Sequence, residues 1–172
     1  MIPCPSCGFE NLEGADHCEQ CQLSLTELSH PQPRSTVEKG LMTDRIELLQ
    51  PRKPLTVSPD DTIGEVLKKM VGASIGCVMI MEGDELRGIF TEFDALMKVN
   101  ASVKSLADRP ISSVMTTKPV TLNLENKIAF ALHKMHVGGY RHVPVLSDGK
   151  LMGVSSIRDI LNYLAQRLMP TG

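Results

Sequence analysis

The sequence contains no tryptophan, and only 3% of its 172 residues are aromatic. Little side-chain surface is therefore available for stacking on nucleic-acid bases. No apolar run approaches the roughly 20 residues that a membrane-spanning helix needs. The longest run, from Ile75 to Met81, contains a glycine, and Met1 to Cys4 do not resemble a secretion signal. These absences lead us to expect a cytoplasmic protein without a membrane segment.

The chain also lacks a large excess of charge of either sign. Its 18 lysines and arginines oppose 20 acidic residues, which gives a net charge of -2 at pH 7. Residues 1–28 hold five of these acids and no lysine or arginine, so the remainder carries 18 basic and 15 acidic side chains. A mildly basic main part suits a small anionic ligand, whereas the acidic amino-terminal segment argues against binding to phosphate backbones. We therefore expect no nucleic-acid partner.

Catalytic motifs are missing as well. The sequence has no nucleophile elbow, no His-Glu-x-x-His motif and no dinucleotide fingerprint, and Gly149-Lys150 lacks the upstream glycine of a phosphate loop. His133 and His136 lie off the apolar stripe of their predicted helix, so we interpret them as solvent-facing. Cys77, in an apolar strand, is interpreted as a small buried hydrophobe. We predict that the protein is not an enzyme.

The other four cysteines form two Cys-x-x-Cys pairs near the amino terminus, Cys4 with Cys7 and Cys18 with Cys21. Two intervening residues let both thiolates of a pair face one ion from a tight turn. A cytoplasmic setting disfavours disulfides. We predict a tetrahedral structural metal site that holds zinc, with iron as the alternative. Four protein ligands leave the ion no open position, so the site would stabilise the fold without doing chemistry.

This segment resembles the short zinc-ribbon modules found at protein termini, because Asn11 and Gly14-Ala15 also match their pattern. Those modules usually have glycine after the last cysteine, where this chain has Gln22, so the second knuckle is expected to be less regular. We place the zinc ribbon at residues 1–28 and expect it to serve docking, assembly or binding of a protein partner. A linker is predicted at 29–53, with one short helix around Thr43 to Leu49.

Beyond the linker, the chain repeats itself without a gap at an offset of 65 residues. The clearest matches superimpose one Gly-x-x-Ser/Thr-x-x-Asp motif on another: Gly88, Thr91 and Asp94 on Gly153, Ser156 and Asp159. A unit of this size cannot bury its own apolar face, so the two copies should stack on each other. We place copy one at residues 54–112, including a connecting segment, and copy two at 113–172.

Apolar periodicity and turn signals predict the same order in each copy: strand, helix, strand, strand, helix. Each hairpin turns at an acidic and glycine-containing tripeptide, at residues 82–84 and 147–149. The apolar residues expected to form the buried stripes of the two closing helices are Phe93, Leu96 and Met97, then Ile157, Ile160, Leu161 and Leu164.

Each closing helix begins with a hydroxyl residue and an acid three positions later, which is the pattern of a capping box. A helix amino terminus also offers free amides and the positive end of a dipole to phosphate, and a carboxylate can accept hydrogen bonds from both ribose hydroxyls. Spacing alone leaves two interpretations open, a helix cap or a nucleotide site, and one residue pair can serve both.

Over residues 54–167 the repeat resembles the tandem CBS-domain pair, or Bateman module. The motifs that carry the resemblance are Val114-Met115-Thr116 before Pro119-Val120-Thr121, then His142-Val143-Pro144-Val145, and the motif that ends each hairpin. The resemblance implies an α/β (α+β) fold, a disk-like module and a homodimer. It also implies a regulatory role, in which an adenine nucleotide such as AMP or ATP, or a related adenosyl ligand, binds in clefts between the copies.

By the same resemblance, Asp94 and Asp159 would bind ribose, and Thr91 and Ser156 would contact phosphate. The other residues implied as ligand contacts, at the base or the phosphate, are Thr56, Val57, Thr121, Leu122, Arg141 and His142. Copy one has Gly76 and Cys77 at the positions of Arg141 and His142, so the two sites are not expected to be equal. A lost charge-assisted contact costs about 1.5 to 3 kcal/mol.

Two functions of other classes remain open from the sequence alone. A ribbon can contact DNA or RNA in a transcriptional regulator, although its uncompensated acids disfavour this. A four-thiolate site can also hold iron and transfer electrons, as in rubredoxin-like proteins.

Overall fold

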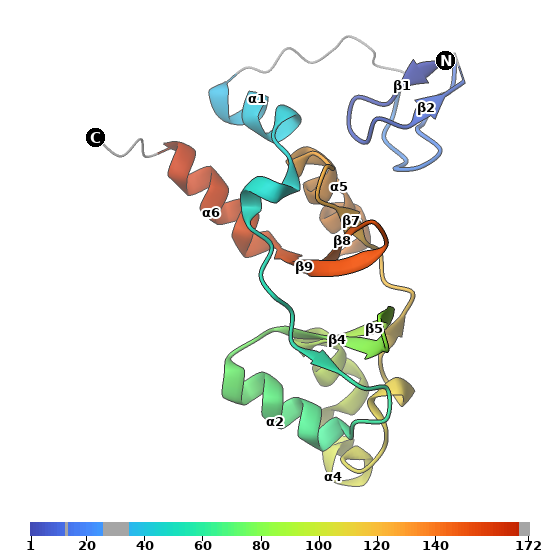
Figure 1. Cartoon of the computed structure of the whole chain (residues 1–172), viewed down its shortest axis with the longest axis vertical. Helices are drawn as coiled ribbons and strands as arrows, with labels where there is room; N and C mark the ends of the chain where they lie inside the picture. The colour runs from blue at the N-terminus through green and yellow to red at the C-terminus, as the bar shows by residue number, and fades with distance from the viewer. Residues whose placement is uncertain (13, 26–34, 169–172) are drawn as a thin grey trace. The chain divides into compact units, whose positions relative to one another are not determined.

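Figure 1 shows the computed structural model of the chain, which describes residues 1–12, 14–25 and 35–168. The chain forms two compact units. Unit 1 contains Met1–Gln50, Asn123–Arg141 and Ser156–Gly172, and unit 2 contains Pro51–Leu122 and His142–Ser155. Unit 2 thus combines segments from both copies of the repeat, whereas unit 1 combines the amino-terminal part of the chain with segments of copy two. Within the described ranges, no helix is both long and apolar enough to cross a membrane.

The amino-terminal ribbon is built on a small antiparallel hairpin of β1 (Ile2–Pro3) and β2 (Glu10–Asn11). Asn11 is almost fully buried and joins the two cysteine knuckles. Its side-chain amide donates to the carbonyl of Phe9 at 2.8 Å, and its side-chain oxygen accepts from the amide of Glu19 at 3.0 Å. The asparagine of the ribbon pattern therefore has a structural role, because it fixes one knuckle against the other.

The segment predicted as a linker contains two helical elements, and its residues 29–34 lie outside the described ranges. Helix α1 (Thr36–Thr43) is capped by the hydroxyl of Ser35, which accepts from the amide of Glu38 at 3.1 Å. The 3₁₀ helix η1 (Ile46–Leu49) follows. The prediction of one helix around Thr43 to Leu49 was therefore wrong at its start. Ser35 followed by Glu38 is a cap signal that the prediction overlooked.

Copy one has the predicted order of elements, but its closing helix is broken. Its first four elements are β3 (Thr56–Val57), α2 (Ile63–Ala73), β4 (Cys77–Glu82) and β5 (Glu85–Thr91). The closing helix consists of short pieces: α3 (Glu92–Asp94), the π turn η2 (Ala95–Val99), η3 (Asn100–Ser102) and α4 (Val103–Leu106). Asn100 has a positive φ of 38°, which is incompatible with a continuous helix.

Copy two follows the same order with an unbroken closing helix. Two short elements precede the repeat elements of this copy: η4 (Ile111–Ser113) and β6 (Thr116–Thr117). The repeat elements are β7 (Leu122–Asn123), α5 (Ile128–Gly138), β8 (His142–Ser147), β9 (Lys150–Ser156) and α6 (Ile157–Leu168). Asp148 and Gly149 both have positive φ, as a type I′ hairpin turn requires. The predicted mixed α/β fold is thus confirmed.

The segment that leads into the first repeat strand of each copy, here called its entry segment, pairs with the hairpin of the other copy. The entry segments contain Arg52 for copy one and β6 for copy two. In unit 2, β6 joins the sheet β3-β4-β5-β6 by pairing with β5, so that Thr117 lies opposite Gly88. Likewise Arg52 forms a bridge with Val154 on β9. A Cβ atom on Gly88 would lie 2.9 Å from the carbonyl oxygen of Thr116, and one on Gly153 would lie 3.0 Å from that of Pro51. The motif glycines therefore allow this close backbone approach.

The sheet of copy one is buried on both faces. Alternate residues of β4, Val78 and Ile80, pack into a core with α2. Cys77 and Met79 point to the opposite face, where Leu151 and Val154 of copy two pack against the cluster that they form. This arrangement explains the nearly continuous apolar run of β4. Cys77 is 7% exposed, which confirms its interpretation as a buried hydrophobe.

The predicted buried stripes of the closing helices were mostly wrong. Five of their seven residues are at least half exposed: Phe93 66%, Leu96 68%, Met97 66%, Ile157 50% and Leu161 63%. Ile160 is buried and Leu164 is half-buried. Each helix is instead rotated so that its capping acid faces inward, since Asp94 and Asp159 are each only 8% exposed. Phe93, Leu96 and Leu161 lie one position before or two positions after such an acid, so they face outward.

Candidate functional site

The four ribbon cysteines converge as a metal site requires. Their sulfur atoms all lie within 4.8 Å of one another, and none forms a disulfide. Cys4 Sγ lies 3.6 Å from Cys21 Sγ, and Cys7 Sγ lies 3.5 Å from Cys18 Sγ. Four thiolates around a tetrahedral zinc ion, at about 2.3 Å each, would lie about 3.8 Å apart. The cluster therefore fits a tetrahedral metal ion.

The two knuckles have the same backbone geometry. The amide of Gly8 donates to the carbonyl of Cys4 at 2.9 Å, and the amide of Gln22 donates to that of Cys18 at 2.8 Å. Gly8 has φ 76° and Gln22 has φ 60°. The expectation that Gln22 makes the second knuckle less regular was therefore wrong, because Gln22 adopts the left-handed conformation that glycine adopts in the first.

The thiol pKa values are set by burial and by hydrogen bonds from the main chain. Burial raises the pKa of Cys18, but the hydrogen bonds from the amides of Cys21 and Gln20 outweigh it and lower this pKa to about 6. Burial raises the pKa of Cys7 to about 11 and also raises that of Cys21. Since the thiolate is the form that binds a metal, binding of a cation to these cysteines would release protons.

At the start of α6, three of the predicted ligand residues lie together in unit 1. Asp159 Oδ2 accepts hydrogen bonds from the amide and the hydroxyl of Ser156, both at 2.7 Å. The amide of Ile157 donates to the carbonyl of Arg141 at 3.0 Å, which places Arg141 beside this helix end. A hydroxyl, a carboxylate and the backbone of an exposed arginine therefore meet at the amino terminus of a twelve-residue helix.

At the equivalent position in unit 2, both carboxylate oxygens of Asp94 have partners. Its Oδ2 accepts from the amide of Thr91 at 2.9 Å and from the Thr91 hydroxyl at 2.7 Å. Its Oδ1 lies 2.7 Å from Lys98 Nζ and 3.2 Å from Thr116 Oγ1. Burial raises the pKa of Asp94, but the bonds from Lys98 and Thr91 outweigh it, so this pKa lies below its ordinary value of 3.8. Both oxygens of Asp94 are thus occupied.

The two helix starts differ in charge and in length. The repeat aligns Glu92 of copy one with Ile157 of copy two, and Lys98 with Tyr163. The Tyr163 hydroxyl donates to Asp44 at 2.7 Å and does not reach toward the cap. The helix that Glu92 begins has only three residues and so has little dipole to offer an anion. An anionic ligand is therefore favoured at α6 over α3.

His142 belongs to copy two by sequence but contacts copy one within unit 2. A Cβ atom added to Gly76 would lie 2.8 Å from His142 Cε1 and 3.3 Å from a carboxylate oxygen of Glu92. The imidazole therefore lies against the backbone of Gly76. Glycine at this position in copy one leaves the space that His142 needs, which gives a physical reason for the difference between the copies.

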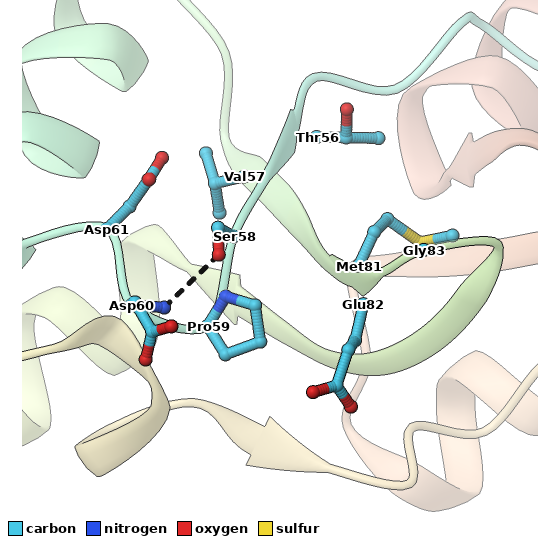
Figure 2. Close-up of a pocket in the computed structure, with 9 residues that line it drawn as sticks. All are labelled: Thr56, Val57, Ser58, Pro59, Asp60, Asp61, Met81, Glu82 and Gly83. Carbon is cyan, nitrogen blue, oxygen red and sulfur yellow. Dashed lines mark hydrogen bonds between the residues drawn. The ribbon is translucent and has the colours of Figure 1, made fainter.

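Unit 2 contains a hollow of about 540 Å³. Figure 2 shows the residues that line it, which are Thr56 and Val57 of β3, the loop 58–61 and residues 81–83. The volume lies in the range of ligand pockets. Val57 is 5% exposed, so it presents mainly its backbone. The lining includes Asp60, Asp61 and Glu82 and no basic residue.

This hollow and the helix start at Asp94 lie at opposite ends of β4. Val57 pairs with Ile80 near the end of that strand, whereas Thr91 pairs with Cys77 at its beginning. The structure therefore does not bring Thr56 and Val57 together with Thr91 and Asp94 in this hollow. Leu122, on β7, is 1% exposed and also presents mainly its backbone, and its neighbour Thr121 is half-buried.

The prediction for His133 was wrong. Its Nε2–H donates to the carbonyl of Cys21 at 2.9 Å, and the neighbouring Lys134 donates to the carbonyl of Gln20 at 3.3 Å. The apolar pattern of α5 could not predict this contact, because the acceptor is a backbone carbonyl of a segment that is distant in the sequence. His136 is exposed, as predicted.

Comparison with known proteins agrees with this architecture. The CBS domain family profile matches residues 45–101 and 111–166, and the first match begins inside the predicted linker. The CBS domain-containing protein CBSCBSPB1 of Arabidopsis thaliana is 39% identical over 106 residues, which cover 61% of this chain and 20% of that protein. The chain thus matches about a fifth of the length of this curated relative.

Solved structures match over nearly their whole length. A CBS-domain containing protein from Agrobacterium tumefaciens is 29% identical, with a TM-score of 0.64 over 69% of this chain and 94% of that one. A CBS domain protein from Pyrobaculum aerophilum, complexed with AMP, is 28% identical, with a TM-score of 0.61 over 71% of this chain and 98% of that one. Two family matches, the internal repeat and the fold agree: the chain belongs to the CBS domain family and carries a pair of CBS domains in tandem.

Proposed function

We propose that the protein is a regulatory module that senses an adenine nucleotide or a related adenosyl ligand at the amino end of α6. The observation that carries this proposal is the meeting of Arg141, Ser156 and Asp159 at that helix end. The helix amides, its dipole and a guanidinium favour phosphate, and a carboxylate suits ribose hydroxyls. The AMP complex of the Pyrobaculum aerophilum relative supports this class of ligand.

In this proposal Asp159 binds the ribose, and Ser156 and Arg141 contact the phosphate. His142, Thr56, Val57, Thr121 and Leu122 belong to unit 2, and they stay predicted ligand contacts by the family resemblance alone. Thr91 and Asp94 form the weaker site, because a ribose there would have to replace Lys98 and Thr116. The protein would regulate rather than catalyse, since a bound ligand shifts a conformational equilibrium by its difference in affinity for the two states.

Thermal unfolding with a ligand panel tests the proposal. AMP, ADP, ATP, S-adenosylmethionine and NAD are each added to the full chain, and a ligand of the folded state should raise its stability by about 2.7 kcal/mol at a hundredfold excess over its Kd. Asp159→Asn should abolish the shift, while the matched Asp94→Asn should retain it. If no member of the panel moves the midpoint, the sensor function is wrong.

A second measurement assigns the phosphate contact. Arg141→Gln should weaken binding of AMP by about tenfold or more, because a charge-assisted bond is lost, and should leave binding of adenosine unchanged. Isothermal titration with the two ligands gives the comparison. Equal losses for AMP and adenosine would contradict the placement of Arg141 at the phosphate.

We further propose that the ribbon holds zinc and stabilises its own segment for docking or assembly. Cys4, Cys7, Cys18 and Cys21 would hold the ion, and their thiol chemistry also admits iron. Four reduced thiols suit a cytoplasmic location. One zinc per chain by elemental analysis and a colourless protein would support zinc, whereas a red ferric protein would support iron.

A homodimer is also proposed, formed through the closing helices. Phe93, Leu96 and Met97 in unit 2 are exposed, and Leu96 borders an apolar groove of about 430 Å³ that α2 also lines. Leu161 on α6 is exposed as well. Leu96→Glu and Leu161→Glu should give monomers in light scattering. Leu48→Glu, at an exposed leucine of η1, is the control and should leave the mass unchanged.

A further inference from the structure

Two adjacent residues of α5 bind the end of the second cysteine knuckle in unit 1. His133 donates to the carbonyl of Cys21 at 2.9 Å, and Lys134 donates to the carbonyl of Gln20 at 3.3 Å. Since a carbonyl only accepts, the Nε2 atom of His133 must carry the proton. The ammonium of Lys134 also lies 5.4 Å from the ring centroid of Phe130, which orients the side chain. The bonded carbonyls belong to the last ligand residue and its neighbour.

The internal repeat provides a control for this face of α5. The repeat aligns Phe130, His133 and Lys134 with Glu65, Lys68 and Lys69 of α2. The three residues of α2 are exposed, whereas Phe130 is 5% exposed and His133 and Lys134 are half-buried. Residues three and four apart share a helix face, so one face is open to solvent in copy one and covered in copy two. An apolar residue, Phe130, replaces the charged Glu65 on the covered face.

We propose that the second cysteine knuckle is a metal-dependent docking element for α5, which couples the metal site to the α6 helix start within unit 1. This inference rests on the metal site proposed above. The carbonyls of Gln20 and Cys21 have a fixed direction only while Cys18 and Cys21 share one ion. Metal binding therefore orders the acceptors that His133 and Lys134 need.

Linkage makes this coupling reciprocal. If metal binding strengthens the contact with α5, then the contact strengthens metal binding by the same factor. Helices α5 and α6 belong to the same unit, so the state of the metal site bears on the helix start with Arg141 and Asp159. The ribbon is thereby a regulatory input to the CBS pair as well as a stable terminus.

Zinc release from the full chain tests the proposal. Zinc-loaded protein is mixed with excess chromogenic chelator, and the rate of metal transfer is followed by absorbance. His133→Ala combined with Lys134→Ala should release zinc about tenfold faster, as expected for the loss of two hydrogen bonds. His136→Ala, an exposed histidine on the same helix, is the matched control and should release zinc at the wild-type rate. Alanine favours helix, so the variants should keep α5.

Amide hydrogen exchange gives the reciprocal readout. Removal of zinc from the wild-type chain should reduce protection in α5 (Ile128–Gly138) and leave α2 (Ile63–Ala73) unchanged. If the chain binds metal, but the double variant matches His136→Ala and exchange in α5 does not respond to zinc, the docking proposal is wrong and the metal site stands. If the chain binds no metal, both proposals are wrong.

Discussion

Lys98 Nζ lies 2.7 Å from Asp94 Oδ1 and so occupies the carboxylate that begins the closing helix of copy one. At the same position of the repeat, copy two has Tyr163, whose hydroxyl binds Asp44. The two motifs are nearly identical in sequence, yet only the first has a lysine four residues after its acid. This difference supports the assignment of the stronger ligand site to α6.

Lys98→Ala should lower the free energy of unfolding by about 0.5 to 1 kcal/mol, since the lysine is partly exposed. The pKa of Asp94 lies below 3.8, so its contribution to stability is complete above about pH 4 and is lost as the pH falls through the folded-state pKa. Without Lys98 this pKa rises, and acid unfolding should begin at a higher pH. Urea unfolding between pH 3 and 7 measures the change.

Lys104→Ala, at an exposed lysine of α4, is the control for this series and should not change the pH at which acid unfolding begins. If Lys98→Ala and wild type lose stability at the same pH, the ion pair is contradicted.

Gly88→Ala and Gly153→Ala should each destabilise the protein by about 1 to 3 kcal/mol, because the added methyl group would overlap backbone of the paired entry segment. Gly72→Ala is the matched substitution in α2, where no atom lies within 4 Å of the new Cβ. It should stabilise the protein by about 0.5 to 1 kcal/mol through helix propensity. Guanidinium unfolding midpoints give all three values. Neutral results at Gly88 and Gly153 would argue against the exchanged entry segments.

Tyr163→Phe should cost about 1 to 2 kcal/mol, because Asp44 loses a hydrogen bond and keeps Arg167. Burial, and then the bond to Asp44, raises the pKa of Tyr163 to about 12. Stability from this hydroxyl is therefore complete below about pH 10 and declines as the pH rises toward 12. The free energy of unfolding, measured from pH 8 to 11, should show this decline in wild type. Tyr140→Phe, which alters an exposed tyrosine, is the control and should show the same decline. The decline should be smaller in Tyr163→Phe.

Gln22→Gly should make the ribbon more stable by about 1 kcal/mol, because glycine adopts positive φ without the strain of a Cβ atom. Gly8→Ala, at the equivalent place in the first knuckle, should destabilise the ribbon by a similar amount. Urea midpoints for zinc release compare the two variants with wild type. Destabilisation by Gln22→Gly would indicate that the glutamine side chain makes a contribution larger than the backbone strain.

The sequence by itself determined the architecture and the chemical class of the candidate sites. A 65-residue repeat of apolar positions requires two similar units, since side-chain periodicity is a local property that follows from helix and strand geometry. The cysteine spacing likewise predicted that the four thiols converge, because two residues between ligands suffice to turn both thiolates of a pair toward one ion. The capping box at Thr91 and the hydrogen bonds from Ser156 to Asp159 were also local and predictable.

Only the tertiary structure decided which partners these residues meet. Local patterns do not specify which segments pair or which way a side chain turns. The structure shows this in the pairing of Thr116 with β5 and of Arg52 with β9, in the ion pair between Lys98 and Asp94, and in the contact of His133 with Cys21. The closing helices show the same limit: burial of the capping acids turned Leu96 and Leu161 outward. The physical reason is that packing selects one rotation and one set of long-range contacts from several that the same local pattern permits.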